Sequence, residues 1–313
     1  MKKLLLFVVL LMSLAACKGK QEAQTQTVLL EISLQDSVKS DSQDVQAVLA
    51  DIRKVIAKRL EVEEKDILEV EGDPTRLSVN LPMPVDTTSI NRLLSQRGEF
   101  GFWETYHSNE IAGLIVEGSK QMKDGERIIR LLKLNSDDYC ILGYVQEKDT
   151  AEVNRLLQNE EIQKRLSPDV RLYWGVQEEM VSRGMFSNED TDMEDSETTF
   201  YGLFCVRGPI AAITGDKIIE AKDEEDSFNH SPIVTMKMNE EGARQFTDLT
   251  KKNIGQPIAI VIDGRVYSAP RVNMEITGGN ASISGQYTPE QTKELALILG
   301  SGILKRTAKI VTK

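Results

Sequence analysis

Histidine, cysteine, aromatic residues and long apolar runs are all scarce in this chain of 313 residues. Two His and three Cys, widely scattered, do not supply the four closely spaced ligands of a structural zinc site. No apolar run reaches the ~20 residues of a membrane-spanning helix. The net charge of -11 argues against nucleic acid as a partner, because phosphate binding needs clustered Lys and Arg. A hydrophobic content of 40% is nevertheless enough to form a core.

Motifs of catalysis and metal binding are absent as well. The sequence has no Gly-x-Ser-x-Gly, no His-Glu-x-x-His and no Walker-type loop, and His107 and His230 stand alone. The acidic segment 190–195 lacks the Gly and the distal Glu of an EF-hand loop, so we predict a solvated loop there. We therefore predict that the chain is not an enzyme and has neither a cofactor nor a metal site.

The N-terminus has the pattern of an export signal. Lys2 and Lys3 precede a short apolar run, Leu4 to Ala16, which predicts a signal peptide over residues 1–16. The run ends in Leu-Ala-Ala-Cys and resembles the lipobox of bacterial lipoproteins, which implies lipidation of Cys17. Residues 17–26 are polar and are interpreted as a tether. An ordinary signal peptide with a chance Cys is the alternative.

Residues 27–106 alternate between strand and helix patterns. Apolar residues repeat every second position in the strands and at helical spacing in the helices. The expected order is a strand at 30–34, a helix at 45–60, strands at 67–71 and 77–81, a helix at 86–94 and a strand at 99–106. The order β-α-β-β-α-β is that of a ferredoxin-like unit. We predict an α+β fold with this unit as its base.

The remainder is predicted to divide into two parts. Residues 107–285 form an inserted region with a head subdomain, and residues 286–313 form a C-terminal helix and strand that return to the base. Thr288, Pro289 and Gln291 are typical of a helix N-terminus. The order cap, helix, Gly, strand occurs both here and at 86–105, which indicates either a weak internal repeat or chance.

Two turns stand out in the last hundred residues. Asp263-Gly264 separates two strand patterns and predicts a two-residue hairpin turn. Gly278-Gly279 predicts another turn, because no Lys or helix start follows at the spacing of a phosphate-binding loop. Cys140 and Cys205 lie in apolar, strand-like runs, so a disulfide between them and two buried free thiols both remain open.

Several segments together resemble one protein family. They are Thr214–Ala221, Asn239–Ala243, Ile258–Pro270, Ile276–Gly279 and Tyr287–Leu299. This set is similar to the first periplasmic domain of SecD, an accessory subunit of the Sec protein-export channel. Phe100–Tyr106 and Asp169–Gly175 look like the fused SecDF proteins of Bacteroidetes.

The resemblance implies a fold and a role. In the family a smaller head is inserted into a ferredoxin-like base, moves relative to it, and is proposed to contact preprotein emerging from the channel. The resemblance also implies structural roles for turn residues, namely Gly242, Asp263, Gly264, Pro270, Gly278 and Gly279.

The departures from the family shape the functional hypothesis. SecD has membrane helices around this domain and uses proton flow through them, whereas this sequence has a lipobox and no such helix. We expect a lipid-anchored, periplasm-facing module without its own proton-driven motor, on an undetermined membrane of the envelope. Its expected partners are unfolded or translocating polypeptide and the Sec translocon or SecDF. The alternative is a non-catalytic adaptor that docks on an envelope complex without touching preprotein.

Overall fold

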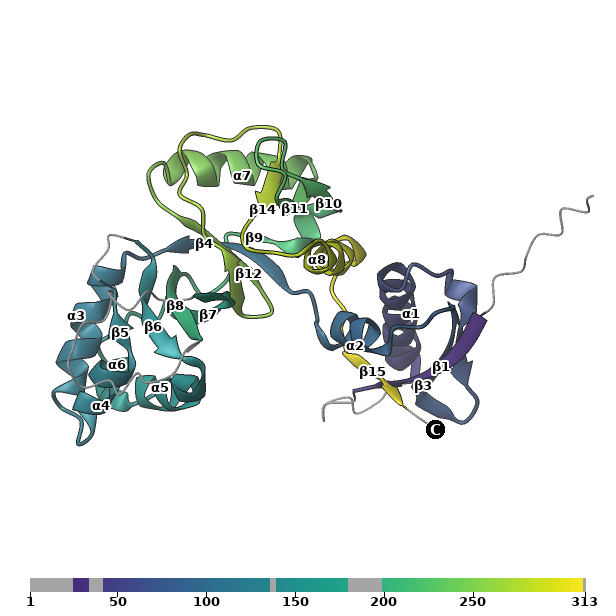
Figure 1. Cartoon of the computed structure of the whole chain (residues 1–313), viewed down its shortest axis with the longest axis horizontal. Helices are drawn as coiled ribbons and strands as arrows, with labels where there is room; N and C mark the ends of the chain where they lie inside the picture. The colour runs from purple at the N-terminus through teal and green to yellow at the C-terminus, as the bar shows by residue number, and fades with distance from the viewer. Residues whose placement is uncertain (1–24, 34–41, 136–138, 180–198, 312–313) are drawn as a thin grey trace, which may run out of the picture.

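The chain forms a mixed α+β structure (Figure 1). The computed structural model describes residues 25–33, 42–135, 139–179 and 199–311. The segment 1–16 predicted as a signal peptide, Cys17 and the acidic segment 190–195 lie outside these residues. Three β-sheets organise the described part of the chain.

The base is a four-stranded antiparallel sheet in the order β15-β1-β3-β2, with two helices. Its elements are β1 (Thr25–Ile32), α1 (Ser42–Arg59), β2 (Ile67–Val70), β3 (Asp73–Pro82), α2 (Thr87–Ser95) and β15 (Ala308–Val311). Alternate residues of β1 and β3 pack with α1 and α2 in one core, while the other face of the sheet carries polar side chains. Because β1 begins at Thr25, the last two residues predicted as tether belong to the sheet.

One strand assigned to the base from sequence lies elsewhere. β4 (Phe100–Thr105) pairs with β12 (Ile258–Ile262) in a different sheet. β15, which lies in the C-terminal segment predicted to return to the base, pairs with β1. The prediction for β4 was wrong because the alternating pattern of a strand shows that it pairs, but not with which partner. Side chains of β4 such as Phe102 are buried against β12 and α7.

The inserted region is built on an eight-stranded sheet in the order β5-β6-β8-β7-β13-β12-β4-β9. The strands not yet given are β5 (Lys133–Leu134), β6 (Ile141–Gln146), β7 (Val170–Glu179), β8 (Phe200–Arg207), β9 (Ile213–Thr214) and β13 (Arg265–Ser268). β4 also pairs with β8, so β8, β7, β13, β12 and β4 close into a ring around an aromatic core that includes Trp103 and Phe204.

Four helices lie beside β6, β7 and β8 at the far end of the molecule from the base (Figure 1). They are α3 (Ser108–Ser119), α4 (Gly125–Leu131), α5 (Thr150–Leu157) and α6 (Glu160–Gln163). Their apolar residues, such as Ile115, Ile128 and Leu156, form a separate core with Leu203 and Cys205 of β8.

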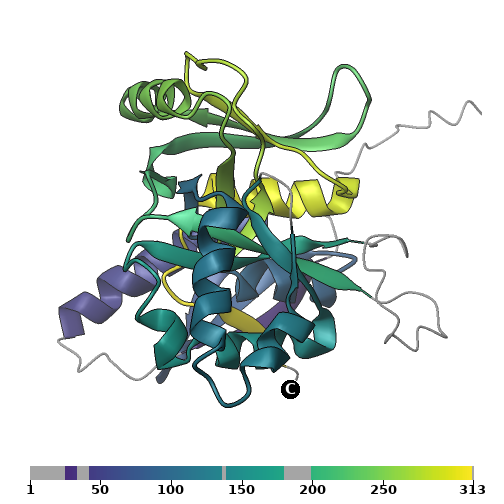
Figure 2. The same ribbon diagram turned by 90° about the vertical axis from the view of Figure 1, so that its left-hand side faces the viewer.

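The head is a three-stranded antiparallel sheet, β10 (Ile218–Glu225), β11 (Pro232–Met238) and β14 (Asn280–Ile283), with α7 (Glu240–Lys252) and α8 (Pro289–Ser301). Val234, Met236 and Ile283 pack with both helices and with β4 and β12 in one core. Figure 1 shows α8 between the head and the base, and Figure 2 shows the β10–β11 hairpin projecting from the upper part of the molecule. Among the described residues, no helix combines the length and the apolar character needed to cross a membrane.

Candidate functional site

The face of the head sheet that turns away from α8 carries a shallow groove of about 560 Å³, here called the head groove. β10, β11 and β14 supply most of its lining residues, and Ile276 comes from the loop that precedes β14. Its lining residues are Glu220, Lys222, Glu224, Ile233, Thr235, Met236, Lys237, Ile276, Asn280, Ala281 and Ser282. The groove therefore mixes charged, hydroxyl and aliphatic groups.

The strand register arranges these side chains in rows across the sheet. Thr235 lies between Lys222 and Ser282. The next row contains Glu220, opposite Lys237. The Lys222 ammonium lies 2.8 Å from the Glu220 carboxylate and holds the pKa of that carboxyl below its usual value. Such a surface offers hydrogen bonds and both signs of charge, but no geometry selective for one small ligand.

Two sheet edges flank the head groove. In the described part of the chain, β10 and β14 each pair only with β11, so both leave one row of backbone groups without a strand partner. An extended polypeptide can add to such an edge by backbone hydrogen bonds and place alternate side chains on the sheet face. The head groove is thus bordered by two strand edges that offer backbone hydrogen-bonding groups.

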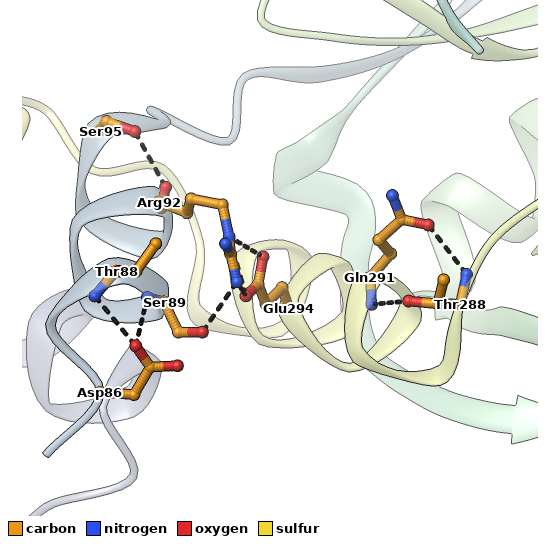
Figure 3. Close-up of polar contacts among 8 residues, drawn as sticks. All are labelled: Asp86, Thr88, Ser89, Arg92, Ser95, Thr288, Gln291 and Glu294. Carbon is orange, nitrogen blue, oxygen red and sulfur yellow. Dashed lines mark hydrogen bonds and ion pairs between the residues drawn. The ribbon is translucent and has the colours of Figure 1, made fainter. Parts of the chain in front are cut away.

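Helix α8 joins the head to the base (Figure 3). It begins with a capping box in which the Thr288 hydroxyl accepts from the Gln291 amide and the Gln291 side chain accepts from the Thr288 amide. Further along, the Glu294 carboxylate accepts from two nitrogens of Arg92 of α2, at 3.1 Å from Nε and 2.6 Å from Nη2. Asp86 caps α2 by accepting from the amides of two residues in its first turn. The ion pair therefore links two well-capped helices.

The junction between base and head is organised by one buried cation. Arg59, the last residue of α1, is fully buried. Its guanidinium donates to the Ser301 hydroxyl (3.0 Å) and to the carbonyl oxygens of Leu93 (2.6 Å), Gln96, Arg97 (2.9 Å) and Gly302 (3.3 Å). These carbonyls include the C-terminal ends of α2 and α8, where backbone acceptors lack helical partners and the helix dipole favours a cation. Burial lowers the pKa of Arg59 to about 10, although the nearby Asp263 carboxylate acts in the opposite direction and raises it.

Asp263, predicted as a hairpin turn residue, also contacts this junction. Its carboxylate accepts from the amides of Gly98 (3.0 Å) and Glu99 (2.8 Å), where the chain leaves the base for β4. Asp263 and Gly264 both have positive φ, as the two-residue turn between β12 and β13 requires. Gly98 has a φ of 77°, and a Cβ there would lie 2.9 Å from Ile298 and 3.0 Å from the Arg59 guanidinium.

The other turn residues singled out from the sequence lie around α7 and β13. Gly242 donates to the Asn239 side chain that caps α7. Gly279 passes so close to α7 that a Cβ would lie 2.6 Å from that of Ala243, and its carbonyl accepts from the Met238 amide. Gly278 also has positive φ. The Pro270 carbonyl accepts from the Ile258 amide at the start of β12.

Of the two alternatives left open for Cys140 and Cys205, the structure has free thiols. Both side chains are buried, and the Cys205 amide donates to the Cys140 carbonyl. The side chains nevertheless pack in different cores, Cys205 with the helices and Cys140 with the aromatic residues. Burial raises the pKa of the Cys140 thiol to about 12 and also raises that of Cys205.

Reasoning from sequence did not single out Arg59, Arg92 or Glu294. In the sequence, Arg59 looks like an ordinary basic residue at the end of an amphipathic helix, because its hydrogen-bond partners are far away in the chain. The described residues contain no group of three or more His, Cys, Asp or Glu side chains suited to hold an ion.

Comparison with known proteins identifies the region that contains the head. Residues 194–306 match the family model described as SecDF, P1 head subdomain. This part of the chain is thus similar to the P1 head subdomain of SecDF. It is also 36% identical to the protein translocase subunit SecD of Rhodothermus marinus over 171 residues, which is 55% of this chain and 25% of that protein. It is 45% identical to SecD of Desulfurispirillum indicum over 98 residues, which cover 31% of this chain and 19% of that protein. The chain thus spans a quarter or less of these two relatives' length.

Solved SecDF structures are similar over a larger share of the chain. A crystal structure of SecDF in its super-membrane-facing form matches 91% of this chain and 29% of its own, with a TM-score of 0.49 and 22% identity. A structure described as belonging to a membrane component SecDF that enhances protein export matches 92% of this chain and 99% of its own, with a TM-score of 0.47 and 22% identity.

Proposed function

We propose that this chain is a lipid-anchored, periplasm-facing SecD-like module that binds polypeptide emerging from the Sec translocon and aids protein export without its own proton-driven motor. The observation that carries the proposal is the P1 head match over residues 194–306, the region that contains the head groove. The groove's mixed polar lining suits an extended chain of varied sequence, because backbone hydrogen bonds supply affinity whatever the side chains.

The lipid anchor is part of the proposal. Its support is the lipobox pattern at Cys17. Residues 17–24 reach at most about 28 Å when fully extended at ~3.5 Å per residue, so an acylated Cys17 keeps the base close to the bilayer. Replacement by Cys17→Ser is expected to release the protein from the membrane fraction and to abolish incorporation of labelled palmitate. Retention of either property would contradict the anchor.

The predicted division into base, inserted region and returning segment also stays in the proposal, with β4 moved from the base to the inserted region. Arg59 contacts the two segments that connect the base to the rest of the molecule, at Arg97 and at Gly302. The head can then hold polypeptide away from the bilayer while the base stays at the anchor.

The test uses the lipidated full chain in detergent and a reduced, carboxymethylated secretory protein as an unfolded probe. Thr235→Arg places a long cation in the middle of the head groove and is expected to weaken binding at least tenfold, as read by fluorescence anisotropy. The matched control is Thr87→Arg, an exposed Thr at the start of α2 outside the groove. Thermal unfolding of both variants checks that the fold is kept.

Two results would contradict polypeptide binding. One is the absence of any binding of the unfolded probe, and the other is equal loss in both variants. The adaptor alternative instead requires one fixed partner that copurifies unchanged when secretion is blocked.

A further inference from the structure

The tip of the β10–β11 hairpin presents one fully exposed aromatic side chain. Phe228 is 94% exposed, the highest value among the large hydrophobic residues that the structure describes as exposed. It does not line the head groove. Burying a Phe side chain is favourable, and the described structure does not bury this one. A single exposed apolar residue is ordinary on a mobile loop, so the conformation of the tip decides what it means.

The tip is held by a network of short hydrogen bonds. The Asp226 carboxylate accepts from the amides of Phe228 (2.9 Å) and Asn229 (3.2 Å), and the Asn229 side chain accepts from the Ser231 amide (2.9 Å). The Asp226 amide donates to the Ser231 carbonyl, and its own carbonyl accepts from the His230 amide. His230 adopts positive φ to close the turn. Phe228 is thus presented on an ordered convex tip, which reduces the entropy lost on binding.

Carboxylates lie on the strand that leads to this aromatic ring. Asp223, Glu224, Glu225 and Asp226 immediately precede the tip. In the part of the chain that the structure describes, Asp223, Glu224 and Asp226 have no Lys or Arg nitrogen within 4.0 Å, while Glu225 has only His230 at 3.7 Å. These charges oppose an anionic lipid surface or nucleic acid and favour a surface rich in Lys and Arg.

We propose that the hairpin tip is a docking knob for a folded protein that has an apolar pocket bordered by Lys and Arg residues, with Phe228 as the anchor. A convex aromatic tip needs a concave partner, which an unfolded polypeptide does not offer. A buried aromatic anchor surrounded by complementary charge is the usual form of an interface hot spot. Phe228 lies outside the head groove, although Glu224 borders both surfaces, so its partner is additional to the polypeptide proposed above.

The first experiment places photoreactive p-benzoylphenylalanine in the full-length chain in cells, in place of Phe228. The matched control carries the same group in place of Ile210, another exposed apolar residue (74% exposed) on the loop between β8 and β9. We expect one dominant protein adduct at position 228 that is missing at position 210. No adduct, an adduct with lipid, or a ladder of many polypeptides would overturn the proposal.

The second experiment measures the affinity of the purified adduct partner for the full chain. Phe228→Ala is expected to weaken binding at least tenfold and Phe228→Leu by less, because Leu retains part of the apolar contact. Reversing two charges outside the head groove, in Asp223→Lys with Glu225→Lys, is expected to slow association at least fivefold at low salt. The control Glu160→Lys changes an exposed carboxylate on α6 and is expected to leave the association rate unchanged.

A partner that binds wild type and Phe228→Ala equally would overturn the anchor role, and an association rate independent of these charges would overturn the basic rim. Binding of the unfolded probe at the head groove is expected to survive Phe228→Ala. The two proposals therefore fail independently.

Discussion

The guanidinium of Arg59 donates a 3.0 Å hydrogen bond to the hydroxyl of Ser301, although the two residues are 242 positions apart. Arg59 ends α1 of the base and Ser301 ends α8, the helix that carries the head sheet. The same guanidinium contacts the carbonyl of Arg97 where the chain leaves the base and that of Gly302 where it returns. One buried side chain therefore contacts both segments that connect the base to the rest of the molecule.

Replacing Arg59 is expected to be costly. Arg59→Met keeps the length of the side chain but leaves buried carbonyl oxygens without a donor, which predicts a loss of about 2–4 kcal/mol in the free energy of unfolding. The control is Arg53→Met on the same helix, where a partly exposed ion pair with Glu69 is replaced and less than about 1 kcal/mol is expected. Urea denaturation measures both. Equal losses would contradict the special role of Arg59.

Gly98 and Gly72 form a matched pair for testing close packing at the junction. Both have positive φ, but a Cβ at Gly72 meets no atom within 4 Å, whereas one at Gly98 meets Ile298 and Arg59. Gly72→Ala is expected to cost about 1 kcal/mol from backbone strain alone. Gly98→Ala is expected to cost about 2–4 kcal/mol, because Ile298 or Arg59 must also move. Similar unfolding free energies for the two variants would show that the junction adapts freely.

The ion pair between Arg92 and Glu294 is expected to couple α2 to α8. Glu294 is mostly buried and accepts from two nitrogens of the guanidinium, a geometry that a flexible surface pair lacks. A double-mutant cycle with Arg92→Met and Glu294→Gln measures the coupling energy. It should exceed that of Lys293 and Glu61, a more exposed pair between α8 and the end of α1 at 3.4 Å. A coupling no larger than in this second pair would contradict the prediction.

The lowered pKa of Glu104 predicts how the stability of the fold changes in acid. Burial raises the pKa of its carboxyl, but bonds from Lys252 (2.8 Å) and Asn253 (3.0 Å) outweigh burial and hold the pKa below the ordinary value of 4.5. The unfolded chain then binds the proton more readily, so the stabilisation is complete above about pH 4.5 and is lost as the pH falls through the folded pKa.

Glu104→Gln is therefore expected to lower the unfolding free energy at neutral pH by less than about 1 kcal/mol, since the site is partly open to solvent. The difference from wild type should shrink below pH 4. Urea denaturation between pH 3 and pH 7 measures this, with Glu160→Gln as a control at an exposed carboxylate on α6. A difference that stays constant across this range would contradict the assignment.

Local signals allowed several elements to be predicted from sequence alone. The apolar spacing within residues 45–60 indicated α1, Asp263-Gly264 indicated the turn between β12 and β13, and Thr288 with Gln291 indicated the start of α8. Each signal lies within a few residues and rests on backbone geometry or helical spacing. The resemblance of residues 214–299 likewise pointed to the region that the P1 head match covers.

The sequence by itself determined the alternation of helices and strands within residues 27–106, the turns and the family resemblance, because these are encoded by neighbouring residues. Only the tertiary structure decided that β4 joins β12, that five strands close into a ring, and that Arg59 is buried at the junction. The segments 86–105 and 288–311 share one local pattern, yet their strands enter different sheets. The physical reason is that strand pairing and charge burial depend on partners distant in the chain, which local periodicity does not specify.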